Sequence, residues 1–266
     1  MNNKSYLSSI DDPNTIITAI PSGTTFPELL EDKLEKYTPY IEEFRDIVLK
    51  SDSSAQVLKY IRNTTVSMDK DKRMSFLKIF RRCVSLVCDT EATKKIQKIS
   101  TDVFIDNYGH TFKSIKRLKE QFDHLTPSQY AALSVLLGEY DNRGEQGYVL
   151  TDMFFTWFED TYPEFTIEGP RGAGKDIQLN SILEGFIDEY PCDFIIRNKS
   201  DKNQIVAVGF ARYDSTRGGA QSDDRTGGNA DKVSKANKYY EKSGKKFKII
   251  FLSDGPGLSH KGNLEN

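Results

Sequence analysis

Residues 193–210 read DFIIRNKSDKNQIVAVGF, and this pattern predicts a β-hairpin. Two short apolar runs, rich in isoleucine, valine and phenylalanine, are separated by the polar turn 197–203. Further along, residues 247–252 (FKIIFL) predict a buried strand that ends at the turn 253–257 (SDGPG). A lysine-rich helix is expected just before that strand. The hairpin, helix and strand together favour an α/β fold in which helices flank a mixed central β-sheet.

The segments next to the hairpin and the strand are more polar. Residues 178–189 predict a short helix, and residues 214–229 (DSTRGGAQSDDRTGGN) predict a long loop. In the lysine-rich helix, spacings of three and four place several lysines on one face: Lys232, Lys235, Lys238 and Lys242. That face is interpreted either as a contact with DNA phosphates or as an ordinary solvated surface.

The chain is expected to begin with a mainly helical region. Apolar residues between Phe76 and Val87 recur at helical spacing, and residues 126–129 (TPSQ) have the form of a capping box with proline at the first helical position. A charged, glycine-rich break (GEYDNRGEQG) follows this helix. We therefore divide the chain into a mainly helical N-terminal region, 1–137, and a sheet-containing region, 138–266.

Composition restricts the class of protein. With 29% charged residues and a net charge of -2, the chain resembles an ordinary globular protein, so any DNA-binding surface must be local. No apolar run approaches the roughly 20 residues that a membrane helix needs, and the first residues lack the apolar core of a signal peptide. The cysteines Cys83, Cys88 and Cys192 have no metal-type spacing and are expected to be reduced. We expect a cytoplasmic protein without a membrane partner.

Residues 169–175 (GPRGAGK) match the spacing of a phosphate-binding loop. The next residue in such a loop is Ser or Thr, whereas this chain has Asp176, whose charge would repel a phosphate. We therefore expect no nucleotide cofactor. Arg171 and Lys175 are interpreted either as contacts to a DNA backbone or as part of a plain surface loop.

The hairpin carries the most suggestive arrangement of site residues. Two carboxylates on neighbouring strands can share a hard cation, which activates water and stabilises the charge that develops on a phosphodiester. Asp193 opens the first strand. Ala207, followed two positions later by Gly209, stands where a second carboxylate and a lysine or polar residue would be expected. On the residues alone, an aspartate at a strand start is more often structural.

Residues 143–264 resemble the C-terminal part of type II restriction endonucleases of the MboI-like, GATC-cutting group of PD-(D/E)XK nucleases. Three blocks carry the resemblance: CDFII (192–196), IVAVGF (205–210) and FLSDGPGL (251–258). They are similar to the family's FDFVI block with the catalytic aspartate, to its strand of the form aliphatic-aliphatic-Glu-x-Asn-aromatic, and to its strand-end block W-I-T-D-G-x-G-W. The order of the blocks and the intervals between them also agree with the family.

The resemblance implies Mg²⁺-dependent, sequence-specific hydrolysis of phosphodiester bonds in duplex DNA by a bacterial enzyme. Asp193 would be the metal ligand, Ala207 would occupy the glutamate slot, and Gly209 would occupy the slot of the lysine or asparagine. Two explanations for the missing glutamate stay open: either Ala207 is an engineered substitution, or another acid supplies the second ligand. The candidates for that acid are Glu168, Glu184 and Asp176.

Because the glutamate is missing, the enzyme is expected to be catalytically impaired as written. If Ala207 is an engineered change, Ala207→Glu would raise Mg²⁺-dependent cleavage. The alternative function is that of a sequence-specific DNA-binding protein with a naturally degenerate nuclease site. A palindromic target would imply a two-fold homodimer, since the symmetry of the protein and of its site must agree.

DNA recognition is expected in the polar loop that leaves the second strand. Arginine pairs with guanine and glutamine with adenine through two hydrogen bonds, and glycines let the backbone approach the duplex closely. The residues expected to recognise DNA in this loop are Arg212, Tyr213, Arg217, Gln221 and Arg225. Further candidates outside it are Arg143, Arg171 and Lys175. A solvated loop without DNA contacts is the alternative.

Overall fold

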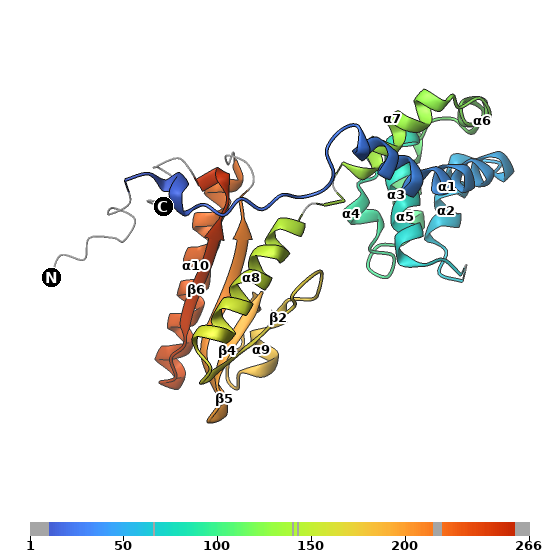
Figure 1. Cartoon of the computed structure of the whole chain (residues 1–266). Coiled ribbons are helices and arrows are strands. Elements are labelled where there is room, and N and C mark those ends of the chain that lie inside the picture. Colours follow the sequence, from blue (N-terminus) through green and yellow to red (C-terminus); the bar gives the residue numbers. More distant parts are fainter. Residues whose placement is uncertain (1–10, 66, 140, 143, 215–219, 259–266) are drawn as a thin grey trace. The chain divides into compact units, whose positions relative to one another are not determined.

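The computed structural model of the chain describes residues 11–65, 67–139, 141–142, 144–214 and 220–258, with the backbone alone at 13–14, 202–203 and 220–226. The chain divides into two compact units (Figure 1). A helical unit comprises Gly23–Asp141, and a sheet unit comprises the residues up to Ser22 together with those from Asn142 onward. The division falls close to the expected boundary after residue 137, but the N-terminal segment belongs with the sheet and not with the helices.

The sheet unit is built on a mixed four-stranded sheet with the strand order β1-β4-β5-β6. Its strands are β1 (Phe165–Glu168), β4 (Phe194–Asn198), β5 (Asp201–Tyr213) and β6 (Lys248–Asp254). The first three are antiparallel neighbours, and β6 runs parallel to β5 after the crossover helix α10 (Ala220–Ser243). The predicted hairpin, a strand near residues 247–252 and the mixed α/β class are thus confirmed. The prediction that this strand is buried is wrong, because β6 lies at the edge of the sheet and its side chains are exposed or only partly buried.

A helix covers each face of this sheet (Figure 1). Helix α8 (Glu145–Thr161) packs Phe155 and Phe158 against one face, in an apolar cluster with residues of β4 and β5. On the opposite face, Tyr239 of α10 belongs to a second apolar cluster, again with residues of β4 and β5. Each strand of the hairpin therefore contributes alternate side chains to two different cores, as the pleat of a strand requires.

The predicted helix over residues 178–189 is much shorter in the structure. Helix α9 (Leu179–Ile182) lies between two short paired strands, β2 (Ile177–Gln178) and β3 (Pro191–Cys192). Leu183, the residue after the helix, has an extended backbone with a φ of -116° and a ψ of 108°, so helical geometry ends at Ile182.

The predicted loop over residues 214–229 is also partly helical. Helix α10 begins at Ala220, so it includes Gly227 and Gly228. A side chain at either glycine would meet no atom within 4 Å, so packing does not oppose a helix here, and glycine lowers helix propensity without excluding it.

The N-terminal segment is fastened to the sheet unit by hydrogen bonds at three places. The Thr18 N–H donates to the Asp254 carboxylate at 3.0 Å. The Tyr213 hydroxyl accepts from the Ile20 N–H at 3.0 Å and donates to the Thr18 carbonyl at 2.7 Å. The Gln146 side chain donates to the Ile20 carbonyl at 2.7 Å. These contacts explain why the segment belongs with the sheet rather than with the helices that follow it.

The helical unit contains the predicted N-terminal helices. Its helices are α1 (Glu28–Lys50), α2 (Ser54–Arg62), α3 (Lys70–Cys83), α4 (Thr90–Thr93), α5 (Thr101–Tyr108), α6 (Ile115–Asp123) and α7 (Pro127–Gly138). Short 3-10 helices are η2 (Pro13–Ile16) in the sheet unit, η3 (Gly109–Thr111) in the helical unit and η4 (Pro256–Leu258) after β6. The predicted capping box of α7 is confirmed by both reciprocal hydrogen bonds between Thr126 and Gln129. No described helix is long and apolar enough to cross a membrane.

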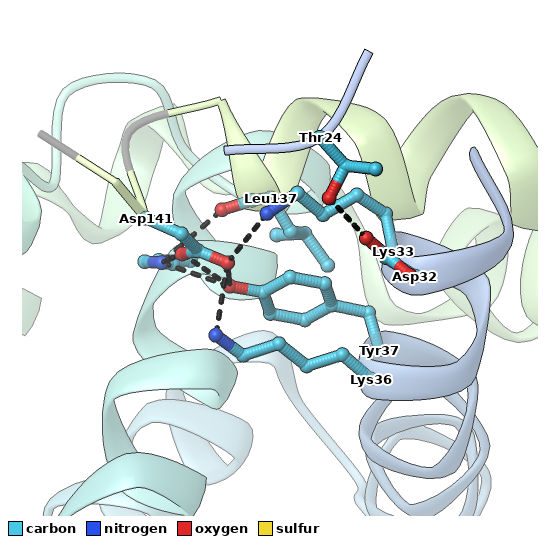
Figure 2. Close-up of polar contacts among 8 residues, drawn as sticks. Thr24, Asp32, Lys33, Lys36, Tyr37, Leu137 and Asp141 are labelled. Carbon is cyan, nitrogen blue, oxygen red and sulfur yellow. Dashed lines mark hydrogen bonds and ion pairs between the residues drawn. The ribbon is translucent and has the colours of Figure 1, made fainter. Parts of the chain in front are cut away.

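One buried carboxylate ties three helical segments together in the helical unit (Figure 2). Asp141 accepts hydrogen bonds from the Tyr37 hydroxyl at 2.6 Å and from the ammonium groups of Lys33, Lys36 and Lys78 at 3.3, 2.9 and 2.8 Å. Burial acts to raise the pKa of Asp141, but the hydrogen bonds outweigh it and hold the pKa well below its ordinary value of 3.8. Because Gly138 has no side chain, the methylene groups of Lys33 can occupy the space beside its Cα.

We expect Asp141→Asn to destabilise the helical unit by about 3 kcal/mol at neutral pH, because buried cations lose their anionic partner. A carboxyl whose folded-state pKa is lowered stabilises the protein above its unfolded pKa, and this contribution is lost as the pH falls toward the folded value. The difference in unfolding free energy between wild type and variant, measured by urea denaturation, should therefore shrink below about pH 4.

The control for this experiment is Lys36→Met, which removes the most exposed of the three lysines. It should cost less than about 1 kcal/mol, as is usual for exposed ion pairs. A wild-type-to-Asn difference that stays constant down to about pH 3 would contradict the role given to Asp141.

Candidate functional site

The contact between Phe194 and Gly209 determines which side chains of the hairpin face which helix. These residues lie opposite each other in the register of β4 and β5, and a side chain at position 209 would fall inside the Phe194 ring. The lysine or asparagine that the family resemblance implies at this position therefore has no room in this packing. Position 209 lies on the α8 side of the sheet, together with Phe194.

Ala207 lies on the same side. It is 3% exposed and belongs to the apolar cluster of Phe155, Phe158, Phe194 and Ile196. A glutamate carboxylate in this slot would enter the core between the sheet and α8. The structure thus places Ala207 in the core. The other members of this cluster have apolar side chains, so none of them could bind a metal ion together with a residue at 207.

Asp193 lies at a bend between β3 and β4, and it faces the other helix. Its N–H donates to the Gly209 carbonyl at 2.9 Å, and its carboxylate accepts from the Ala211 N–H at 2.7 Å. Burial raises the pKa of this carboxyl, the Ala211 hydrogen bond lowers it, and the charges of Asp176 and Lys232 act in opposite directions on it. Asp193 is therefore half-buried beside one further acid and one cation.

The structure does not bring Asp193 and Ala207 together around one ion. Ala207 pairs with Ile196 in the hairpin register, whereas Asp193 lies three residues before Ile196 and interacts with Lys232 of α10. Ala207 lies in the core on the α8 side, whereas Asp193 lies at the bend before β4 and its carboxylate binds the Ala211 N–H of β5.

A second carboxylate does lie next to Asp193, and it is Asp176. Asp176 directly precedes Ile177, which pairs with Cys192 in the short β2–β3 ladder, and Asp193 directly follows Cys192, so the two acids flank the last pair of this ladder. The charge of Asp176 acts on the pKa of Asp193. Burial and the charges of Asp193 and Asp176 raise the pKa of the Cys192 thiol to about 12, which agrees with this placement of both acids. Asp176 is exposed, so the pair opens toward solvent.

The two other candidate acids lie apart from this pair. Glu168, at the end of β1, forms an ion pair with Arg197 at 3.2 Å and is half exposed. Glu184 is exposed in the segment after α9, where its carbonyl accepts from the Tyr239 hydroxyl at 3.2 Å. Neither residue is among the charges that act on the pKa of Asp193.

The cation beside Asp193 is Lys232, which the structure separates from the neighbouring lysines of α10. Its ammonium lies 3.7 Å from the centre of the Phe210 ring and 5.9 Å from that of Phe251. Burial lowers the pKa of Lys232, and the charge of Asp193 raises it. Two of the other lysines on the predicted face, Lys238 and Lys242, are exposed to solvent. The four lysines therefore do not form one common surface.

The expected recognition residues have different roles in the structure. Arg212 donates through Nε to the buried Asp214 carboxylate at 2.7 Å, which orients its guanidinium. Tyr213 uses its hydroxyl to hold the N-terminal segment. Arg143 and Arg217 lie outside the described residues, and the side chains of Gln221 and Arg225 do as well.

The glycine-rich loop is attached to α8 rather than free to cradle a phosphate. Arg171 forms ion pairs with Asp152 at 2.7 Å and with Glu159 at 2.6 Å, and it lies over the ring of Phe155. Lys175, next to Asp176, is exposed. Of the two basic residues expected here, Arg171 is thus already neutralised by α8.

Sequence reasoning named Lys232 only as one of four lysines on a face that could contact phosphates, and named Asp176 only among alternatives. The position of each residue next to a buried element is the signal that could have found it. Asp176 immediately precedes Ile177, the strand partner of Cys192. Lys232 lies seven residues, two helical turns, before the buried Tyr239. Among the described residues no group of three His, Cys, Asp or Glu side chains lies close enough together to hold a metal ion. The site therefore consists of two carboxylates and a helix-borne lysine.

Comparison of the chain with protein-family models, with curated proteins and with solved structures found no significant match.

We expect Ala207→Glu to destabilise the sheet unit by about 3 kcal/mol or more, because it buries an unpaired carboxyl against phenylalanine side chains. It should not raise DNA cleavage, because the new carboxylate lies on the α8 side, away from Asp193. Thermal unfolding and a Mg²⁺-dependent cleavage assay measure the two effects.

Gln204→Glu is the matched control, since it adds the same charge to an exposed position of the same strand. Its unfolding temperature should stay close to that of the wild type. Cleavage that rises by orders of magnitude in Ala207→Glu would show instead that position 207 belongs to the site.

Proposed function

We propose that the sheet unit is a Mg²⁺-dependent nuclease domain that hydrolyses phosphodiester bonds in duplex DNA, with Asp193 and Asp176 as its acidic residues. The observation that carries the proposal is that Asp176 and Asp193 flank the last pair of the β2–β3 ladder, while the charges of Asp176 and Lys232 both act on Asp193. An acid pair and a partly buried cation are the groups that a phosphodiester and a divalent ion require.

The arrangement of elements supports the same proposal. A helix, three antiparallel strands, a crossover helix and a parallel fourth strand follow in order from α8 to β6. This is the mixed sheet with helices on both faces that the resemblance to restriction endonucleases implies, and Asp193 opens the strand expected to carry the catalytic aspartate. The proposal departs from that resemblance in the second acid, which comes from the segment before β2 and not from β5.

The two carboxylates fit a hard divalent cation. Mg²⁺ usually keeps several waters and is held by one or two protein carboxylates, so a pair of aspartates open to solvent is a sufficient protein contribution. When bound, the ion would lower the pKa of a water ligand and stabilise charge on the phosphate. The Ala211 N–H holds one carboxylate oxygen of Asp193 at 2.7 Å and so orients the group. The half-buried position of Asp193 strengthens its interactions with charges nearby.

Sequence-specific cutting of duplex DNA, as by a type II restriction endonuclease, is the finer form of the proposal. Arg212 follows Ala211, the residue of β5 whose N–H binds the Asp193 carboxylate. Its guanidinium is held by Asp214, so Arg212 is the described residue best placed to contact a base or phosphate near the cut. A guanidinium held in one orientation loses less entropy when it binds DNA. A palindromic target would call for two copies of the chain related by a two-fold axis.

A second candidate function is that of a DNA-binding protein whose nuclease site is degenerate. Its support is specific: Ala207 is a core residue and Gly209 is covered by Phe194, so β5 provides no acid on the α8 side. In this case the chain would bind a selected duplex sequence without cutting it.

We expect the wild-type chain to nick or cut unmethylated plasmid DNA and random-sequence duplexes when Mg²⁺ or Mn²⁺ is added. Asp193→Asn and Asp176→Asn should each lower the cleavage rate by at least about 100-fold, because each removes a negatively charged ligand. The exposed Glu164, which lies between α8 and β1, provides the control Glu164→Gln.

Selection of bound duplexes from a random pool distinguishes the two candidate functions. Sequence enrichment together with cleavage that depends on Asp193 supports the restriction endonuclease. Enrichment of a sequence that the wild type never cuts with either ion would replace the nuclease by the DNA-binding protein.

A further inference from the structure

We infer that Lys232, carried by helix α10, is the catalytic cation of the proposed nuclease site and binds the scissile phosphate in place of a lysine on the strand. This inference rests on the proposed function and extends it to a residue that neither the hairpin pattern nor the family resemblance assigns. Three observations support it. They are the position of the Lys232 ammonium, the lack of room for a lysine at positions 207 and 209 of β5, and the charges around that ammonium.

Two stacked aromatic rings hold the ammonium on the α10 side of the sheet. Phe210 of β5 and Phe251 of β6 are neighbours in the parallel register, with ring centres 5.6 Å apart and planes inclined by 24°. The Nζ of Lys232 lies 3.7 Å from the centre of the Phe210 ring. A cation over an aromatic face is attracted to it without being neutralised, so the ammonium keeps its charge for a ligand.

The strand itself cannot supply the cation on its α8 side. A lysine at position 209 would collide with the ring of Phe194, and position 207 faces the apolar cluster with Phe155. Phe210 directly follows Gly209, whose carbonyl accepts from the Asp193 N–H, and it is itself the platform for Lys232. A helix above the sheet is therefore the element that provides a lysine here.

The charges around Lys232 distinguish it from its neighbours on α10. Asp193 is the nearest acid acting on it from the sheet, Asp231 acts from its own helix, and Arg212 opposes both as a like charge. Lys235, one turn later, forms an ion pair with Asp231 at 2.8 Å and donates to the Glu189 carbonyl at 3.4 Å. The ammonium of Lys232 therefore lies over Phe210 and acts on Asp193, whereas Lys235 is paired within the surface of the unit.

The chemistry needs a positive charge at this place. Hydrolysis joins a water oxygen to phosphorus and breaks the bond between phosphorus and one ester oxygen. One proton of the water ends on the leaving alkoxide and the other passes to solvent. Negative charge grows on the phosphate oxygens and on the leaving oxygen in the transition state, and a pre-oriented ammonium in a partly desolvated site stabilises it. Lys232 is not consumed in this step.

The test compares Lys232→Met, Lys232→Arg and the control Lys246→Met. Methionine keeps the stem that covers Phe210 but removes the charge. Lys246 is the matched control because its ammonium also lies over an aromatic ring, that of Tyr240 at 4.5 Å, yet it is not among the charges that act on Asp193. Single-turnover cleavage is measured with Mg²⁺, duplex affinity with Ca²⁺ in its place, and folding by thermal unfolding.

We expect Lys232→Met to lower the single-turnover rate by at least about 100-fold. Its duplex affinity should fall by less than about tenfold, the effect of losing one phosphate contact. Lys232→Arg should recover part of the rate, and Lys246→Met should cut at the wild-type rate. This split between rate and affinity separates a catalytic charge from a merely structural lysine, whose loss would lower the unfolding temperature instead.

Two outcomes would overturn the inference in different ways. If Lys232→Met folds and cuts at the wild-type rate while Asp193→Asn does not cut, the nuclease stands and Lys232 has no catalytic role. If neither the wild type nor any variant cuts duplex DNA with Mg²⁺ or Mn²⁺, the proposed function fails and the inference fails with it.

Discussion

The ring of Phe194 occupies the space in which a side chain at position 209 would stand, and the rest of the sheet unit depends on this contact. It fixes the register of β4 and β5, because a slip of one residue would exchange the two faces of each strand. Alternate residues of the hairpin are thereby assigned to α8 or to α10. Each side becomes an apolar core, and the ammonium of Lys232 lies over Phe210 on the α10 side.

This division of the two faces determines what the site can do. Asp193 lies at a bend just before the first strand of the hairpin. Its carboxylate accepts a hydrogen bond from the backbone of β5, and the charges of Asp176 and Lys232 act on it. A carboxylate that is half-buried feels nearby charges more strongly than one in water, and it remains reachable by an ion from solvent. Two short strands before the hairpin and one helix after it therefore complete a site that the hairpin alone does not contain.

Most of the sheet could be predicted from the sequence, whereas the site could be predicted only in part. The hairpin and the strand in FKIIFL follow from short apolar runs between strong turn residues. The burial expected for that strand does not follow, because it lies at the edge of the sheet. The position of Asp193 at the head of a strand follows from the same pattern. The face that Ala207 occupies could not be predicted, because a bulge in the pairing near Arg197 changes the register between the turn and the strand centre.

Longer-range contacts were harder still to foresee. Asp176 is brought near Asp193 by the pairing of β2 with β3, and these two-residue strands have too few residues to show a period. Lys232 is one of several lysines at helical spacing, and its inward direction is decided by Phe210 and Phe251 on strands that are distant in the sequence. Tertiary packing, and not local propensity, selects both residues.

The central claim is that one divalent ion binds between Asp176 and Asp193. The most direct measurement is the position of Mn²⁺ in crystals of the full chain, located by its anomalous scattering. We expect a peak that both carboxylates contact and that disappears in Asp193→Asn. If saturating Mn²⁺ binds elsewhere and Asp193 contacts only the Ala211 amide and Lys232, no ion binds between Asp176 and Asp193 and the proposed site is wrong.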